Sequence, residues 1–97
     1  MGLLSMEEVR RKIHDLKGWE LYDNMLQKKY SFRTFKTAMQ FVNRVAELAD
    51  SVDHHPDMMI NYNRVLLKLM THSQGGITDR DFNLAQMIDQ VEKPPTI

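Results

Sequence analysis

The chain has 97 residues, which is enough for one domain with a modest core. Its 13 basic and 13 acidic residues cancel to a formal net charge of zero, so no bulk attraction to nucleic acid or an anionic membrane is expected. The sequence has no cysteine, which excludes disulfides and thiolate chemistry. We expect a cytoplasmic protein, because the N-terminus lacks a signal-peptide pattern and no apolar run approaches the ~20 residues of a membrane span.

The first third of the chain predicts a helix followed by a β-hairpin. Residues 5–8, Ser-Met-Glu-Glu, match a capping box. Apolar residues then recur at helical spacing, so we expect a helix over about 6–16. Alternating residues over 19–32 predict two strands, and Asp23-Asn24 between them is typical of a tight turn.

A long amphipathic helix is predicted next, with Thr34 as its N-cap. Its apolar stripe extends to Ala49 and covers about half of the circumference, at ~100° per residue. One sheet face rarely needs so wide a stripe. Phe41 and Leu48 lie together at its edge, and we hypothesise that they meet a second subunit. Pro56 prevents the helix from running through the residue before it.

The second half predicts a further hairpin and a final helix. Residues 58–62 and 64–71 alternate as strands, and they are joined by a turn. Residues 73–76 form a loop. Thr78 to Asp81 reads as a variant of the capping box that opens the last helix, and Lys93-Pro94-Pro95 ends it.

The predicted element order is α-β-β-α-β-β-α. Two hairpins predict an α+β fold with a four-stranded antiparallel sheet and three helices packed on one face. We expect a single domain over residues 1–97, with a core over about 5–91 and a frayed C-terminal tail. The uncovered face of the sheet would carry Leu66 and Met70, which favours a partner or substrate as its cover.

The pair His54-His55, directly before Pro56, is the most informative feature for chemistry. Histidine has an unperturbed pKa of ~6.5, which suits proton transfer near neutral pH. Carboxylates that fix tautomers are available nearby from Asp50, Asp53 and Asp57. Spacing alone equally allows a structural role, in which the three residues only shape a turn between helix and strand.

Two further residues join this pair through the predicted topology. His72 ends the last strand, and a hairpin that turns near Tyr62 brings the exit of this strand beside the entry of its neighbour, where His54 and His55 lie. Taken alone, His72 would read as a surface residue. Asp81 falls on the inward side of the last helix, where it either caps the helix or orients a histidine.

A metal centre is the weaker reading of these histidines. Three histidines with nearby aspartates suit zinc, but the chain has neither a His-Glu-x-x-His helix nor a cysteine pair. Gly75-Gly76 precedes a helix, yet it lacks the sequence context of a phosphate-binding loop. We therefore expect no metal at these histidines.

In combination these residues resemble the pterin-4a-carbinolamine dehydratases. The resemblance extends over about residues 5–91, from Trp19-Glu20 near its start to Asn83-Leu84-Ala85 near its end. Its most specific part is the run Asp50-x-x-x-His54-His55-Pro56-Asp57, followed by Tyr62-Asn63, Thr71-His72 and Asp81.

The resemblance implies dehydration of 4a-hydroxytetrahydropterin to quinonoid dihydropterin, in the recycling of tetrahydrobiopterin and without a metal or organic cofactor. Residue by residue, it implies that the catalytic groups are His54, His55 and His72, that Asp50 and Asp81 support them, and that Trp19, Pro56 and Asp57 bind substrate. It also implies a homodimer or homotetramer. The alternative is an interaction module that acts as a dimerisation cofactor of a transcription factor, without direct contact to nucleic acid.

Overall fold

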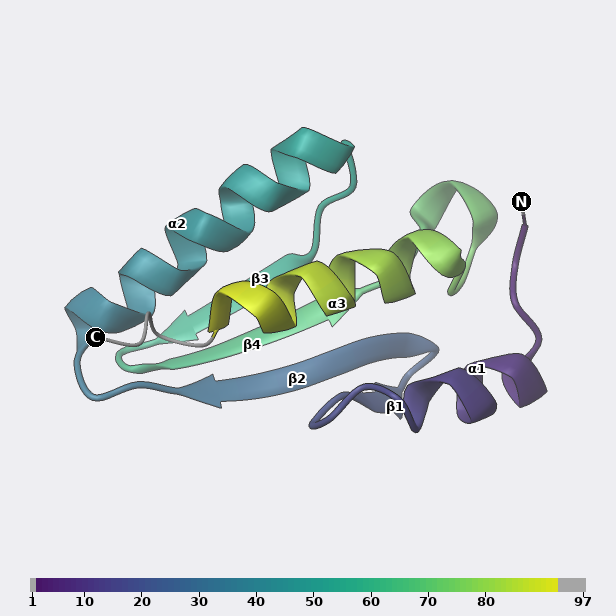
Figure 1. Cartoon of the computed structure of the whole chain (residues 1–97), viewed down its shortest axis with the longest axis horizontal. Helices are drawn as coiled ribbons and strands as arrows, with labels where there is room; N and C mark the ends of the chain where they lie inside the picture. The colour runs from purple at the N-terminus through teal and green to yellow at the C-terminus, as the bar shows by residue number, and fades with distance from the viewer. Residues whose placement is uncertain (1, 93–97) are drawn as a thin grey trace.

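The computed structural model describes residues 2–92 and contains a four-stranded antiparallel sheet (Figure 1). The elements are α1 (Met6–Ile13), β1 (Glu20–Tyr22), β2 (Met25–Ser31), α2 (Phe35–Val52), β3 (Asp57–Asn61), β4 (Arg64–Leu69), the 3-10 turn η1 (His72–Gln74) and α3 (Asp79–Glu92). The strands lie in the order β1-β2-β4-β3. The predicted α+β class and the order α-β-β-α-β-β-α are confirmed.

The helix starts agree with the capping patterns of the sequence. Ser5 and Glu8 form both halves of a capping box at α1, and the Thr34 side chain accepts a hydrogen bond from the N–H of Thr37 at α2. The end of α1 differs, because the helix stops at Ile13 rather than near residue 16. The chain instead turns, and the turn directs Leu16 into the core, where it is buried.

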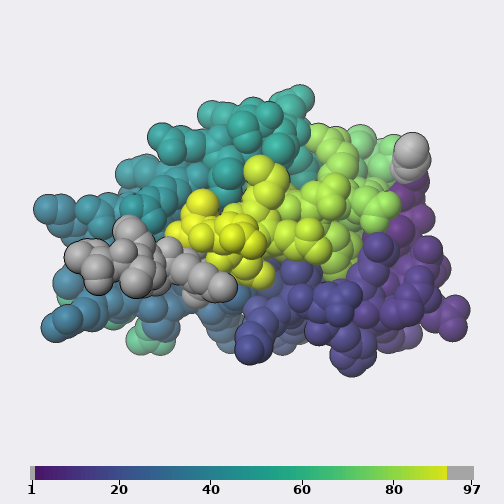
Figure 2. All heavy atoms as spheres, in the orientation of Figure 1, coloured from purple at the N-terminus to yellow at the C-terminus, as the bar shows by residue number. Residues whose placement is uncertain are grey.

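One face of the sheet forms the core with the helices. The alternation along β4 buries Val65, Leu67 and Leu69 on this face, and Leu26 of β2 lies opposite Leu69. Helices α2 and α3 pack over these side chains, and Figure 2 shows the molecule from the side that the helices cover. Each fully buried leucine contributes about 1.5–3 kcal/mol, so this layer is a main source of the stability of the fold.

The wide apolar stripe of α2 packs against other elements of the same chain. Phe41 is buried, with its ring centroid 4.6 Å from that of Tyr30 and 5.1 Å from that of Phe32. Leu48 is half-buried against the same core. Helix α2 contacts both the sheet and α3, so it needs apolar residues on two sides. The hypothesis that Phe41 meets a second subunit is therefore wrong.

The segment after β4 differs from the predicted strand over 64–71. The ladder ends at Leu69, Thr71 forms an isolated bridge with Gly76, and His72 begins η1 instead of ending a strand. This compact turn brings the chain back to start α3 beside the end of α2. The predicted stop at Lys93-Pro94-Pro95 lies outside the described residues. Among residues 2–92, no helix has the length and apolar character to span a membrane.

Candidate active site

The end of α2 separates two adjacent histidines. Asp53 caps the helix in the left-handed region, at φ 51° and ψ 44°, and the N–H of His54 still bonds to the carbonyl of Ala49 at 3.1 Å. Aspartate tolerates this conformation better than most residues do. The turn that follows places His54 in the interior at 8 % exposure, whereas the neighbouring His55 stays exposed.

His54 is paired with a fully buried carboxylate. Its Nε2 lies 2.5 Å from Oδ1 of Asp81, whose exposure is 0 %. The other oxygen, Oδ2, accepts hydrogen bonds from the hydroxyl of Thr71 and from the backbone N–H of Thr78, both at 2.9 Å. Asp81 thus does both things that its sequence position allowed: it caps α3 and holds a histidine.

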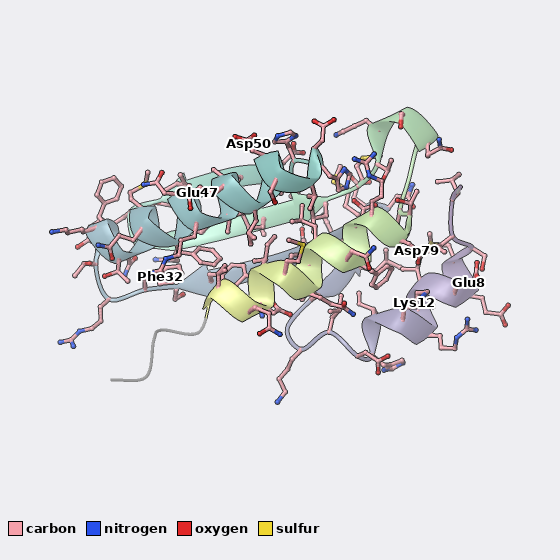
Figure 3. The ribbon with its side chains drawn as sticks, turned by 45° about the horizontal axis from the view of Figure 1, so that its top comes forward. Glu8, Lys12, Phe32, Glu47, Asp50 and Asp79 are labelled. Carbon is pink, nitrogen blue, oxygen red and sulfur yellow. The ribbon has the colours of Figure 1, made fainter. Side chains whose placement is uncertain are left out.

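His55 has a carboxylate partner of a different kind. Its Nε2 lies 2.9 Å from Oδ1 of Asp50, five residues earlier near the end of α2. The side chains are 55 % and 82 % exposed, respectively. Figure 3 shows Asp50 on the outer side of this helix end, and Asp79 marks the start of α3. Water therefore reaches both members of this pair.

The three histidines border one cavity of about 250 Å³. Its lining comprises Asp53, His54, His55, Met70, Thr71, His72, Ser73 and Arg80. The expectation that the His54-His55 turn and His72 are spatial neighbours is therefore confirmed, although His72 reaches the cavity from η1 and not from a strand. The volume lies near the lower end of small-molecule sites, which suits a compact ligand.

Arg80 is a residue that the reasoning from sequence missed. It lines the histidine cavity and two neighbouring cavities of about 330 and 180 Å³. Its Nη2 donates to the carbonyl of Asp53 at 2.7 Å, which ties the start of α3 to the end of α2. A basic residue in the first turn opposes the helix dipole, and this local conflict was the signal available in the sequence.

The three residues expected to bind substrate differ in their surroundings. Trp19 is buried in the core, where its indole N–H donates to Asp89 at 3.0 Å. Pro56 is half-buried and Asp57 is exposed at the start of β3. None of the three lines the histidine cavity. Within residues 2–92, no group of three or more histidine, cysteine, aspartate or glutamate side chains converges as metal ligands would.

Comparison with known proteins identifies the family. A family model described as Pterin 4 alpha carbinolamine dehydratase matches residues 2–91. The chain belongs to the pterin-4a-carbinolamine dehydratase family. A relative from Sulfurisphaera tokodaii that bears the family's name is 45% identical over 91 residues, which cover 94% of this chain and 98% of the relative.

Two solved structures place the fold in the same group. A Brucella melitensis protein described as a transcriptional coactivator/pterin dehydratase superposes with a TM-score of 0.89 at 32% identity, over 93% of this chain and 98% of its own. A pterin dehydratase-like protein described as a RuBisCO assembly factor in the alpha-carboxysome reaches a TM-score of 0.64 at 18% identity, over 79% and 89% of the two chains. The second likeness concerns the fold alone.

Proposed function

We propose that this chain dehydrates a 4a-hydroxytetrahydropterin to the quinonoid dihydropterin by histidine acid and base catalysis. The observation that supports it best is the cavity in which His54, His55 and His72 meet, with two of them held by carboxylates. The family name and the relative from Sulfurisphaera tokodaii support the same reaction.

The chemistry requires two proton transfers at one site. The bond between C4a and its hydroxyl oxygen breaks, and an acid protonates the oxygen so that water leaves. A base takes the proton of the adjacent ring nitrogen as the C=N bond forms. Each positioned group contributes about 10²–10⁴-fold to the rate.

We assign His55 and His72 as the acid and base pair, because both are exposed and can exchange protons with water between turnovers. His54 is buried and held through Nε2, so it binds the pterin ring and contributes to proton transfer from a fixed position. Asp50 and Asp81 set the ring tautomers of the histidines they contact.

Single substitutions of the histidines by alanine test the proposal. We expect His54→Ala, His55→Ala and His72→Ala each to lower kcat for 4a-carbinolamine dehydration by about 10²–10⁴-fold. The exposed His14, which caps the end of α1, offers a matched control whose alanine variant should keep full turnover. Undiminished turnover in all three cavity variants would contradict the proposal.

The physiological setting belongs to the same proposal. Aromatic amino acid hydroxylation would supply the substrate, and its dehydration would be one step in the recycling of tetrahydrobiopterin. A cytoplasmic location stays a prediction from the sequence. Trp19, Pro56 and Asp57 stay proposed substrate-binding residues on the resemblance alone, since none of them lines the cavity.

We also propose self-association, as a homodimer or homotetramer. Strand β3 is an edge of the sheet; the exposed fractions of its residues Met59 and Ile60 are 58 % and 42 %, and that of Tyr62, which follows it, is 65 %. An exposed apolar edge strand pairs readily with another chain. Light scattering after size-exclusion chromatography should give a mass above one chain, and Met59→Lys should lower that mass.

A second candidate function follows from the Brucella melitensis relative, whose description includes transcriptional coactivator. In this reading the chain binds a transcription factor and does not itself contact nucleic acid. Phe35 of α2, 50 % exposed, is the apolar side chain on that helix best placed to meet a partner. Phe35→Glu should disrupt such a contact and spare turnover, whereas His55→Ala should do the reverse.

A further inference from the structure

Two buried threonines have had no role so far, and one of them, Thr71, is among the residues that line the histidine cavity. Thr71 follows β4 and Thr78 precedes α3, and their exposures are 3 % and 5 %. Their hydroxyl oxygens lie 2.7 Å apart. Thr71 continues the buried row of Val65, Leu67 and Leu69, where valine would have the same shape. A buried hydroxyl is costly unless it is hydrogen-bonded, so the bonds of these two hydroxyls offset the cost of placing them in the interior.

The donor and acceptor roles of the Thr71 and Thr78 hydroxyls can be assigned in only one way. The backbone N–H of Arg80 donates to the Thr78 hydroxyl oxygen at 3.2 Å. The single hydroxyl hydrogen of Thr71 goes to Oδ2 of Asp81. Between the two threonines, Thr78 must therefore donate and Thr71 accept. The chain of bonds runs from Arg80 through both hydroxyls to the carboxylate.

This arrangement makes Asp81 an acceptor at every contact. Oδ2 receives the Thr71 hydroxyl and the Thr78 N–H, and the donors hold the carboxylate in one orientation. Oδ1 is then available to accept a hydrogen from Nε2 of His54. Hydrogen bonds to a charged group are stronger than neutral ones, and they strengthen along a connected chain in a dry interior.

We propose that Thr71 and Thr78 are positioning residues, which keep the ring proton of His54 on Nε2 and leave Nδ1 as the acceptor toward the substrate cavity. The inference rests on the proposed dehydration and adds the groups that decide which nitrogen of His54 meets the substrate. A ring whose proton sits on the other nitrogen presents a donor where an acceptor is needed, and the reaction slows.

The decisive comparison is Thr71→Val with Thr71→Ser. Valine keeps the shape and removes the donor to Asp81, whereas serine keeps the donor and removes a methyl group. We expect Thr71→Val to lower kcat by about tenfold or more with KM changed less than about threefold, because a bond to a charged group is lost. Thr71→Ser should stay within about threefold of wild-type kcat. Equal losses in both variants, or wild-type kcat in a folded Thr71→Val chain, would overturn the inference.

If Thr71→Val does not fold, Thr78→Val tests whether the two hydroxyls act together. Thr78→Val removes the outer hydroxyl and leaves the bond from Thr71 to Asp81 in place. Its kcat should fall by about two- to fivefold, while Thr78→Ser retains wild-type kcat. Unchanged kcat in Thr78→Val would remove the support for a connected chain of hydroxyls.

A spectroscopic test is independent of turnover. In the ¹⁵N-histidine-labelled wild-type chain, two-bond ¹H–¹⁵N correlations should show the His54 ring protonated on Nε2 and bare on Nδ1. The Thr71→Val chain should show both nitrogens partly protonated. A wild-type ring that carries its proton on Nδ1 would overturn the inference. A wild-type chain with the expected ring but no dehydratase activity would instead refute the proposed function.

Discussion

The molecule presents the same pair of groups twice, in two different environments. His54 with Asp81 lies in the interior, with both side chains less than one-tenth exposed and further donors on the carboxylate. His55 with Asp50 lies at the surface, with both side chains more than half exposed. The two histidines are adjacent in sequence and line the same cavity.

The difference shows how one site can combine a fixed imidazole with an exchangeable one. In the interior, charges interact strongly and partners are expensive to remove, since a broken buried pair leaves its remaining member unsatisfied. At the surface, water and salt screen the attraction, and such pairs are worth about 0–1 kcal/mol. His54 therefore keeps its orientation, whereas His55 can exchange protons with solvent.

The largest expected effect comes from breaking the inner pair. Asp81→Asn places an amide where three donors converge, so at least one of them loses its acceptor. We expect the free energy of unfolding to fall by about 3 kcal/mol or more, measured by urea denaturation. The kcat for dehydration should fall by at least ~100-fold.

Asp79 provides the matched control for that substitution. It lies two residues earlier on α3, its side chain is 68% exposed, and it contacts Lys12 at 3.6 Å. Asp79→Asn should change the free energy of unfolding by about 0–1 kcal/mol. Similar losses at positions 79 and 81 would mean that the number of acidic caps, and not the buried pair, decides stability.

The corresponding Asp→Asn substitution in the exposed pair of Asp50 and His55 should have a smaller effect on kcat and on stability. Asp50→Asn removes the charge beside His55 and keeps an acceptor oxygen. A loss of about 0–1 kcal/mol corresponds to at most about a fivefold fall in kcat, with stability almost unchanged. A hundredfold loss of kcat would show that the exposed carboxylate does more than orient the ring.

Salt should separate the two pairs further. Raising the ionic strength from ~0.1 to ~1 M shortens the screening length from about 10 to 3 Å. The kcat difference between wild type and Asp50→Asn should then shrink, whereas the difference for Asp81→Asn should persist, because the inner pair is out of reach of ions. A salt-dependent Asp81→Asn effect would indicate that the interior opens to solvent.

The smallest expected effect concerns an exposed carboxylate remote from the cavity. Hydrogen bonds from the backbone N–H and the hydroxyl of Ser5 hold the pKa of Glu8 below its usual value. The capping box therefore stabilises α1 at pH values above the ordinary glutamate pKa of ~4.3, and this stabilisation is lost as the pH falls through the lower folded-state pKa. Denaturation from pH 6 to pH 3 should show Glu8→Ala and wild type converging at the acid end, with kcat unaffected near neutral pH.

The sequence predicts the fold better than the details of the site. Capping patterns and alternation fix where the elements begin and which residues of β4 face the core. They do not show that Phe41 packs against two rings of its own chain, since a helical wheel contains no neighbours. The predicted strand over 64–71 also extends two residues beyond the observed end of β4, because alternation continues to Thr71 while the hydrogen bonds of the ladder stop at Leu69.

For the site, the topology of a hairpin was enough to bring His72 toward the histidine pair. The inward position of Asp81 on its helix was also readable. The contacts of the threonine hydroxyls and of Arg80 were not readable, because they join the ends of α2, β4 and α3, and local patterns contain no such long-range geometry. Trp19, which the resemblance associates with the site, lies in the core, and its contact with substrate stays a prediction.

One carboxylate is both the cap of α3 and the partner of His54. Fraying of the first turn of α3 would therefore dismantle the site even while the sheet stays intact. Amide hydrogen exchange reads such partial opening residue by residue. The Thr78 amide donates to Asp81, so its exchange rate reports how often the contact between the start of α3 and this carboxylate opens in the folded protein.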